Sequence, residues 1–147
     1  MNTNKMILTI EAKSQNESFA RSVVGAFFSQ LNPTIEQIED LKTAVSEAVT
    51  NCIVHGYQGA QEGKIEIKCM LDFANGFIQV QIVDYGKGID DVDQAMQPFY
   101  TTVPGEERSG MGFTVMESFM DRVEVVSGPE EGTKVTMIKR LDLSYGY

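Results

Sequence analysis

A carboxylate and a carboxamide stand four residues apart in a stretch of the chain that carries no other acidic or basic group. Glu47 and Asn51 have this spacing, and His55 follows after another four residues. Residues four apart lie on neighbouring turns of an α-helix, so the three side chains are expected to form one slanting stripe. A solvated helix face is the usual explanation for such a stripe, but the intervening residues are uncharged. A carboxylate beside an amide oxygen suits a general base next to a metal-coordinating group.

A second candidate motif is Asp84-Tyr85-Gly86-Lys87-Gly88, which follows an alternating apolar segment. Asp and Gly are common in turns, and a simple turn is one interpretation. A dinucleotide-binding fingerprint is a poor match, because its third glycine and its long crossover helix are missing. The alternative is an Asp held at a strand end, followed by glycines that let a flat ring approach the backbone.

A third motif, Ser109-Gly110-Met111-Gly112-Phe113, lies where a long polar segment gives way to a helical pattern. The glycines are either a flexible entry to the helix or a set of exposed backbone N–H groups at its positive end, which suits phosphate. Arg108, just before them, would supply a cation with five fixed donors for a terminal phosphoryl group. Each motif is weak alone, and the three are stronger in this order and spacing.

The elements that must position these motifs alternate between strand and helix periodicity. Strands are expected at residues 6–12, 65–73 and 78–82 and in a final pair joined at 128–132, and helices at 16–30, 34–56 and 112–120, with a short one near 92–97. Thr34 is expected to cap the second helix together with Gln37. This order predicts an α+β two-layer sandwich, with a mostly antiparallel mixed sheet and helices on one face. Residues 84–111 exceed the usual length of a connection, which is typical of a functional loop.

Composition excludes several classes of function. The 147 residues include 12 Lys and Arg against 21 Asp and Glu, a net charge of −9, which disfavours duplex nucleic acid as a partner. The sequence has no apolar run of membrane-spanning length and no signal peptide, so we expect one cytoplasmic domain over residues 1–147 without a membrane partner. The two cysteines, Cys52 and Cys69, form neither a metal-binding spacing nor a disulfide framework.

Together the three motifs resemble those of the GHKL (Bergerat) ATP-binding family, which includes gyrase, a heat-shock chaperone, histidine kinases and mismatch-repair ATPases. Residues 47–51 resemble its N box, residues 84–88 its G1 box and residues 110–112 its G2 box. The resemblance covers roughly residues 6–140. More narrowly, four segments are similar to the anti-sigma F factors, a family of bacterial sporulation serine kinases; they are residues 16–21, 46–51, 100–102 and 108–117.

The resemblance implies ATP and Mg²⁺ as cofactors and assigns a role to each matching residue. Glu47 would accept the proton of the incoming hydroxyl, Asn51 would coordinate magnesium, and Asp84 would accept a hydrogen bond from the adenine amino group. Gly86 and Gly88 would make room for the base and ribose. Residues 98–109 would form a mobile lid, and Arg108 would contact the terminal phosphate or the docked partner. Further nucleotide contacts are implied at Thr101, Thr102, Ser109, Gly110, Met111 and Gly112.

The resemblance also implies protein partners. As a homodimer with bound nucleotide, the protein would hold the sporulation sigma factor F away from RNA polymerase, and it would phosphorylate a serine of an anti-anti-sigma factor. Glu17 and Arg21 match positions that would face these partners, although an i, i+4 surface ion pair explains their spacing equally well. His55 is expected to have a packing or supporting role. Two alternatives remain: a nucleotide-gated module that sequesters sigma with little kinase activity, and a related partner-switching kinase for another sigma factor.

Overall fold

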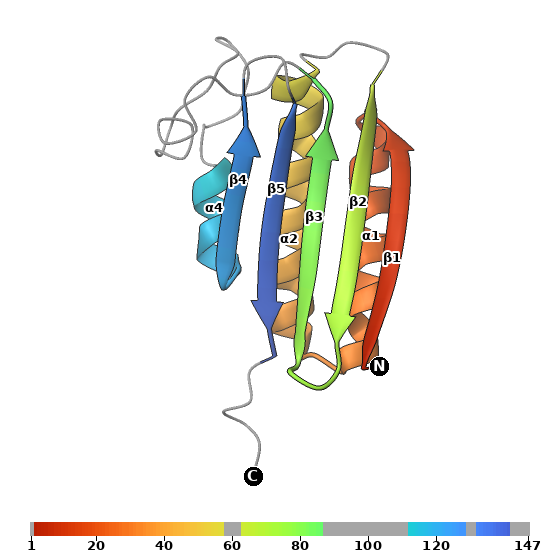
Figure 1. Ribbon diagram of the computed structural model, residues 1–147, viewed down its shortest axis with the longest axis vertical. Helices are drawn as coiled ribbons and strands as arrows, with labels where there is room; N and C mark the ends of the chain where they lie inside the picture. Colours follow the sequence, from red (N-terminus) through yellow and green to blue (C-terminus); the bar gives the residue numbers. More distant parts are fainter. Residues whose placement is uncertain (1, 58–62, 87–111, 129–131, 142–147) are drawn as a thin grey trace.

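A single five-stranded sheet with helices on one face forms the body of the protein (Figure 1). The computed structural model describes residues 2–57, 63–86, 112–128 and 132–141. The strands are β1 (Thr3–Glu11), β2 (Lys64–Asp72), β3 (Phe77–Asp84), β4 (Arg122–Ser127) and β5 (Thr133–Arg140), in the spatial order β1-β2-β3-β5-β4. The prediction of a two-layer α+β fold is confirmed. All four pairings among these strands are antiparallel, so the described sheet contains no parallel pair.

The helical layer is built around α2. This helix (Ile35–Asn51) runs behind the middle of the sheet, with α1 (Gln15–Phe28) on one side and α4 (Gly112–Phe119) on the other (Figure 1). A short 3₁₀ turn, η1 (Ser29–Leu31), follows α1, and Asn32 then takes a left-handed conformation that ends it. No helix of the described residues has the length and apolar character needed to cross a bilayer.

The core lies between the sheet and these helices and follows the two sequence periodicities. Every second side chain of β2 and β3 is buried, as the alternating pattern predicts. On α2 the buried residues recur at helical spacing, and Leu41, Val45 and Val49 have no exposed area. Burying such side chains contributes roughly 1.5–3 kcal/mol each, so this apolar contact fixes how α2 lies on the sheet.

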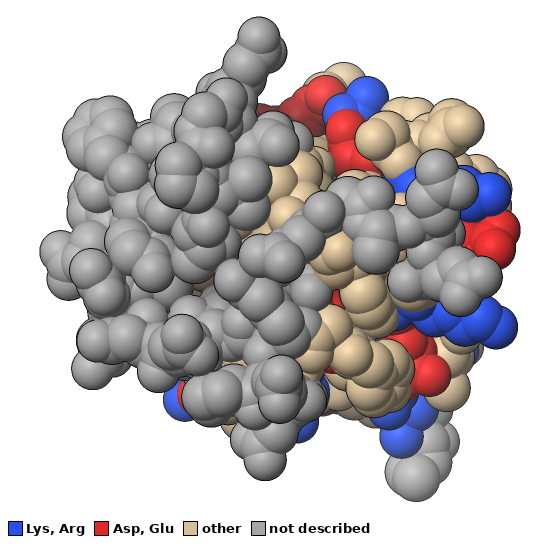
Figure 2. All heavy atoms as spheres, turned by 90° about the horizontal axis from the view of Figure 1, so that it is seen from above, with Lys and Arg blue, Asp and Glu red and all other residues tan. Residues whose placement is uncertain are grey.

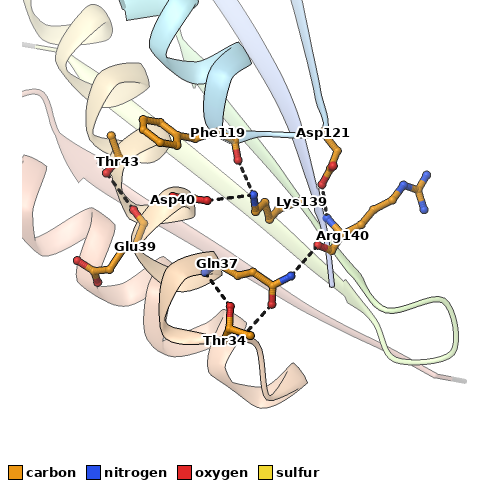
Figure 3. Close-up of polar contacts among 9 residues, drawn as sticks. All are labelled: Thr34, Gln37, Glu39, Asp40, Thr43, Phe119, Asp121, Lys139 and Arg140. Carbon is orange, nitrogen blue, oxygen red and sulfur yellow. Dashed lines mark hydrogen bonds and ion pairs between the residues drawn. The ribbon is translucent and has the colours of Figure 1, made fainter. Parts of the chain in front are cut away.

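Polar contacts fix the beginning of α2 relative to β5 and α4 (Figure 3). The predicted cap is present: the Gln37 N–H donates to Thr34 Oγ1 at 3.1 Å, and the Thr34 N–H donates to Gln37 Oε1 at 2.9 Å. The Gln37 side chain also donates to the Arg140 carbonyl. Lys139 Nζ lies 2.6 Å from the Phe119 carbonyl and 3.5 Å from Asp40 Oδ2. Three elements that are distant in sequence are therefore joined at this end of the sheet.

The second helix differs from the sequence prediction in its last turn. The expected single helix over residues 34–56 is α-helical only to Asn51, and a π-helical turn, η2 (Cys52–Gly56), follows it. Its i→i+5 hydrogen bond runs from the Tyr57 N–H to the Cys52 carbonyl at 3.0 Å. The Tyr57 hydroxyl after this turn bonds the backbone of Lys64, which begins β2, and of Tyr85, which follows β3. Such a turn depends on contacts with distant strands, which helical periodicity does not encode. The expected short helix at 92–97 lies outside the described residues.

Candidate functional site

Three chain segments that carry the predicted motifs meet at one end of the sheet, the upper end in Figure 1. They are the end of α2 with Asn51, the end of β3 with Asp84, and the beginning of α4 with Gly112. Gly112 lies directly against Asn51: a Cβ atom at Gly112 would be 2.9 Å from Asn51 Nδ2 and 3.2 Å from Oδ1. A side chain at position 112 would therefore displace the amide, which explains physically why a glycine begins this helix.

Asp84 is a buried carboxylate at the end of β3, with 3% of its surface exposed. Its Oδ1 atom accepts a hydrogen bond from the Gly86 N–H at 2.9 Å. Burial raises the pKa of Asp84, while hydrogen bonds from the Gly86 N–H, the Cys52 thiol and the Thr133 N–H act in the opposite direction. A carboxylate has about four acceptor positions, so Asp84 keeps capacity for one more N–H donor.

Cys52 supports Asp84 from the first residue of the π-turn. The thiol is 3% exposed, and burial together with the neighbouring Asp84 charge raises its pKa well above the usual value. The thiol is therefore protonated at neutral pH and acts as a donor to the carboxylate.

Gly132 and Thr133, which the sequence motifs did not single out, complete the surroundings of Asp84 from β5. Thr133 is the register partner of Asp84 across β3 and β5. Gly132 has a φ of +80°, and a Cβ atom there would lie 2.2 Å from the Asp84 carbonyl oxygen. Only a residue without a side chain fits so close to that backbone. Gly132 and Thr133 are 48 and 49 positions after Asp84 in the sequence, so no local motif links them to it. Only the register between β3 and β5 could have identified them.

The predicted magnesium ligand, the amide oxygen of Asn51, is a single protein ligand beside Gly112. Among residues 2–57, 63–86, 112–128 and 132–141, no group of three or more His, Cys, Asp or Glu side chains could hold a metal. Magnesium commonly takes one or two protein ligands and completes its shell with phosphate oxygens and water. The single amide oxygen of Asn51 fits such an ion, because it lies beside Gly112, where the predicted phosphate-binding motif meets α4.

The other predicted site residues divide into those within and those outside the described structure. Glu47 is half-buried on α2, one turn before Asn51. Gly86, two residues after Asp84, donates its backbone N–H to the Asp84 carboxylate. His55 is half-buried on the π-turn. The lid over residues 98–109 lies outside the described residues, as do Gly88, Thr101, Thr102, Arg108, Ser109, Gly110 and Met111.

Glu17 and Arg21 form the ion pair that their spacing suggests, and they are also linked to α2. Arg21 Nη1 lies 3.2 Å from Glu17 Oε2. The Ser46 hydroxyl donates to the same carboxylate at 2.9 Å, and Arg21 donates to Ser46 Oγ at 3.3 Å. Ser46 immediately precedes Glu47, so the predicted partner-binding pair of α1 is joined to the helix that carries the predicted base. A role in partner binding stays a prediction.

Charges of both signs lie on the described part of this end of the molecule. Figure 2 looks onto the end, and on the part drawn in colour basic and acidic side chains lie beside one another. A bound polyanion would therefore gain little attraction from the described surface as a whole and would depend on local donors or a cation.

Known proteins resemble the chain over nearly its whole length. The histidine kinase-like ATPase domain family matches residues 10–139. The chain is 59% identical to the anti-sigma F factor of Thermoanaerobacter sp. (strain X514) over 138 residues, which cover 93% of this chain and 94% of that protein. It is 52% identical to the anti-sigma F factor of Clostridium botulinum (strain Eklund 17B / Type B) over 143 residues, which cover 97% and 99%.

Solved structures share the fold at much lower sequence identity. The chain matches the crystal structure of the RsbU and RsbW domains of Rv1364c from Mycobacterium tuberculosis with a TM-score of 0.68 and 19% identity, over 94% of this chain and 32% of that one. A blue-light activated histidine kinase of Erythrobacter litoralis matches with a TM-score of 0.58 and 15% identity, over 88% and 43%. At these identities the likeness concerns the fold alone.

Proposed function

The chain belongs to the histidine kinase-like ATPase family and, within it, to the anti-sigma F factors, and from this we propose that it is an anti-sigma factor that is also an ATP- and magnesium-dependent protein serine kinase. Its sigma partner would be the sporulation sigma factor F, which it would hold away from RNA polymerase as a cytoplasmic homodimer. Its phosphate acceptor would be a serine of an anti-anti-sigma factor. Nucleic acid and membranes have no direct part in this proposal.

One observation carries the nucleotide-binding part of the proposal: Asn51, Asp84 and Gly112 converge at one end of the sheet from three separate segments. The buried Asp84 carboxylate has an acceptor position left, which suits the amino group of adenine. Gly112 leaves space against Asn51 where α4 begins, and backbone N–H groups at that helix end suit phosphate. The base and the phosphates of one ATP would thus bind to opposite sides of the same end.

Phosphoryl transfer would then need little from the protein beyond positioning and one base. Magnesium held at Asn51 would offset the negative charge of the phosphates. Glu47, one turn away on the same helix, would take the proton of the acceptor serine as its oxygen bonds to the terminal phosphorus. The bond between that phosphorus and the bridging oxygen would break, and ADP would leave.

The test is transfer of labelled phosphate from ATP to the anti-anti-sigma factor in the presence of magnesium. Glu47→Gln keeps the size of the side chain but removes the base, so labelling is expected to fall about 100-fold or more while ATP still binds. Glu39→Gln is the matched control, because Glu39 is exposed two turns earlier on α2. Labelling by this control is expected to equal that of the wild type.

Other outcomes would favour the alternatives. If neither wild type nor Glu47→Gln labels the acceptor, yet ATP strengthens binding to sigma, the protein is a nucleotide-gated sequestering module. If labelling occurs but a different sigma factor is retained in a pull-down against several, it is a partner-switching kinase for that factor.

A further inference from the structure

Tyr57 connects the end of the helical layer to two strands through one hydroxyl group. The hydroxyl donates to the Lys64 carbonyl at 2.6 Å and accepts from the Tyr85 N–H at 2.8 Å. Lys64 begins β2, and Tyr85 directly follows the last residue of β3. The backbone N–H of Tyr57 itself is bound to the Cys52 carbonyl, which closes the π-turn.

The position of the hydroxyl relative to the strand register is specific. The last register pair of β2 and β3 at this end is Ile65 with Asp84, so Lys64 and Tyr85 would form the next pair. The Tyr57 hydroxyl lies between the carbonyl of one and the N–H of the other. It therefore takes the place of a direct bond between the strands and extends the ladder by one inserted step beyond Asp84.

This inserted step bears directly on the Asp84 side chain. The two backbone N–H groups after Asp84 both have partners: Tyr85 donates to Tyr57, and Gly86 donates to the Asp84 carboxylate. The ring of Tyr85 is 66% exposed and so contributes little to holding this segment. Tyr57 therefore anchors the backbone N–H directly after Asp84, in addition to the Cys52 and Thr133 donors that reach the carboxylate itself.

Packing and protonation keep Tyr57 in this position. Gly63 lies against the ring, since a Cβ atom there would be 2.7 Å from ring carbon Cδ1. Burial raises the pKa of the Tyr57 hydroxyl, so it remains protonated and keeps its bond to the Lys64 carbonyl at neutral pH.

We propose that Tyr57 is a positioning residue for base recognition, which holds Asp84 in the orientation that accepts the adenine amino group. The proposal rests on the proposed function, because it assumes that Asp84 binds adenine. Tyr57 itself does not touch the base in this proposal. Its effect is limited to nucleotides whose base carries that amino group.

The experiment compares two nucleotides that differ only in this group. Tyr57→Phe removes the hydroxyl and keeps the ring, and affinity is measured by calorimetry with magnesium for ATP and for purine riboside triphosphate, which lacks the amino group. We expect ATP affinity to fall about five- to tenfold, the usual effect of losing one hydrogen bond. The affinity for purine riboside triphosphate is expected to stay at the wild-type value.

Two further variants keep the test independent of a general loss of stability. Thr43→Ala removes an exposed hydroxyl from α2 that bonds only the Glu39 carbonyl, so the ratio of ATP affinity to purine riboside triphosphate affinity should not change. Gly63→Ala should displace the Tyr57 ring. It should therefore lower the ATP affinity relative to the purine riboside triphosphate affinity, as Tyr57→Phe does. A variant that is merely less stable would lower the affinities for both nucleotides by the same factor.

Two results would overturn the inference in distinguishable ways. If wild type binds both nucleotides and Tyr57→Phe changes both affinities equally or neither, Tyr57 does not act through Asp84. If wild type binds neither nucleotide, the proposed function fails, and the inference about Tyr57 fails with it.

Discussion

The Asp84 carboxylate is buried, which disfavours its charged form, whereas the proposed contact with adenine uses an acceptor position that this charged form provides. Burial raises its pKa, and three hydrogen-bond donors limit the rise. Because the net shift is upward, the folded protein binds the proton of the Asp84 carboxyl group more tightly than the unfolded chain does. The contribution of Asp84 to stability is therefore fully present below the unfolded pKa of 3.8 and is lost as the pH rises through the folded pKa.

Nucleotide binding should follow the opposite trend with pH. A protonated Asp84 loses an acceptor position, so the ATP affinity is expected to fall on acidification at a higher pH than an ordinary Asp would require. Calorimetric titration from pH 7 downward would measure this, with purine riboside triphosphate as the control for protonation of the phosphates. Parallel curves for the two nucleotides would contradict the assignment of Asp84 to the adenine amino group.

At the scale of single residues, local patterns predict the polar groups of the candidate site but not the residues that support them. The structure brings Asn51, Asp84 and Gly112 to one end of the sheet, and these three were predicted because a helical spacing and glycine motifs are local patterns. Tyr57 and Thr133 were not, because their roles depend on a hydroxyl inserted between strands and on a register across β3 and β5. No pattern within a short window of sequence contains either relation.

At the scale of elements, the beginning of α2 is fixed by its own cap. Thr34→Ala removes the acceptor for the Gln37 N–H and is expected to lower the free energy of unfolding by about 1 kcal/mol. Thr43→Ala on the same helix is the control, because Thr43 is exposed and its hydroxyl only bonds the carbonyl one turn earlier. Urea denaturation measures both, and an equal loss for the two variants would show that the cap is unimportant.

The same end of the helical layer is also held by Lys139, whose side chain is 13% exposed. Lys139→Met would leave Asp40 and the Phe119 carbonyl without this donor, at an expected cost of about 1–3 kcal/mol. Lys68→Met, which breaks the more exposed pair with Glu66, should cost about 0–1 kcal/mol. Thermal or urea unfolding of both variants checks the difference, and similar losses would contradict it.

Element types were more predictable than element endings and neighbours. The alternating segments became strands and the segments of helical period became helices, because each pattern buries one face. The π-helical end of the second helix and the place of β5 between β3 and β4 were not predicted. Both depend on contacts between segments far apart in the chain, which compete with local preference.

At the scale of the whole molecule, the net charge of −9 opposes the binding of another polyanion. Removing magnesium with EDTA is therefore expected to weaken ATP binding about tenfold or more, whereas binding of uncharged adenosine should not change. Calorimetry with both ligands measures this difference. Equal ATP affinity with and without EDTA would mean that the protein balances the triphosphate charge by itself.

The placing of β3 in the sheet has a consequence for how the molecule opens. It is flanked by β2 and β5 and covered by α2, whereas β4 is at an edge and α4 has only eight residues. In native-state hydrogen exchange, amides of β3 should exchange only when the whole chain unfolds, and those of α4 through smaller and more frequent fluctuations. In the proposed function, a bound nucleotide would therefore lose its phosphate contacts at α4 first, while β3, which ends in Asp84, remains folded.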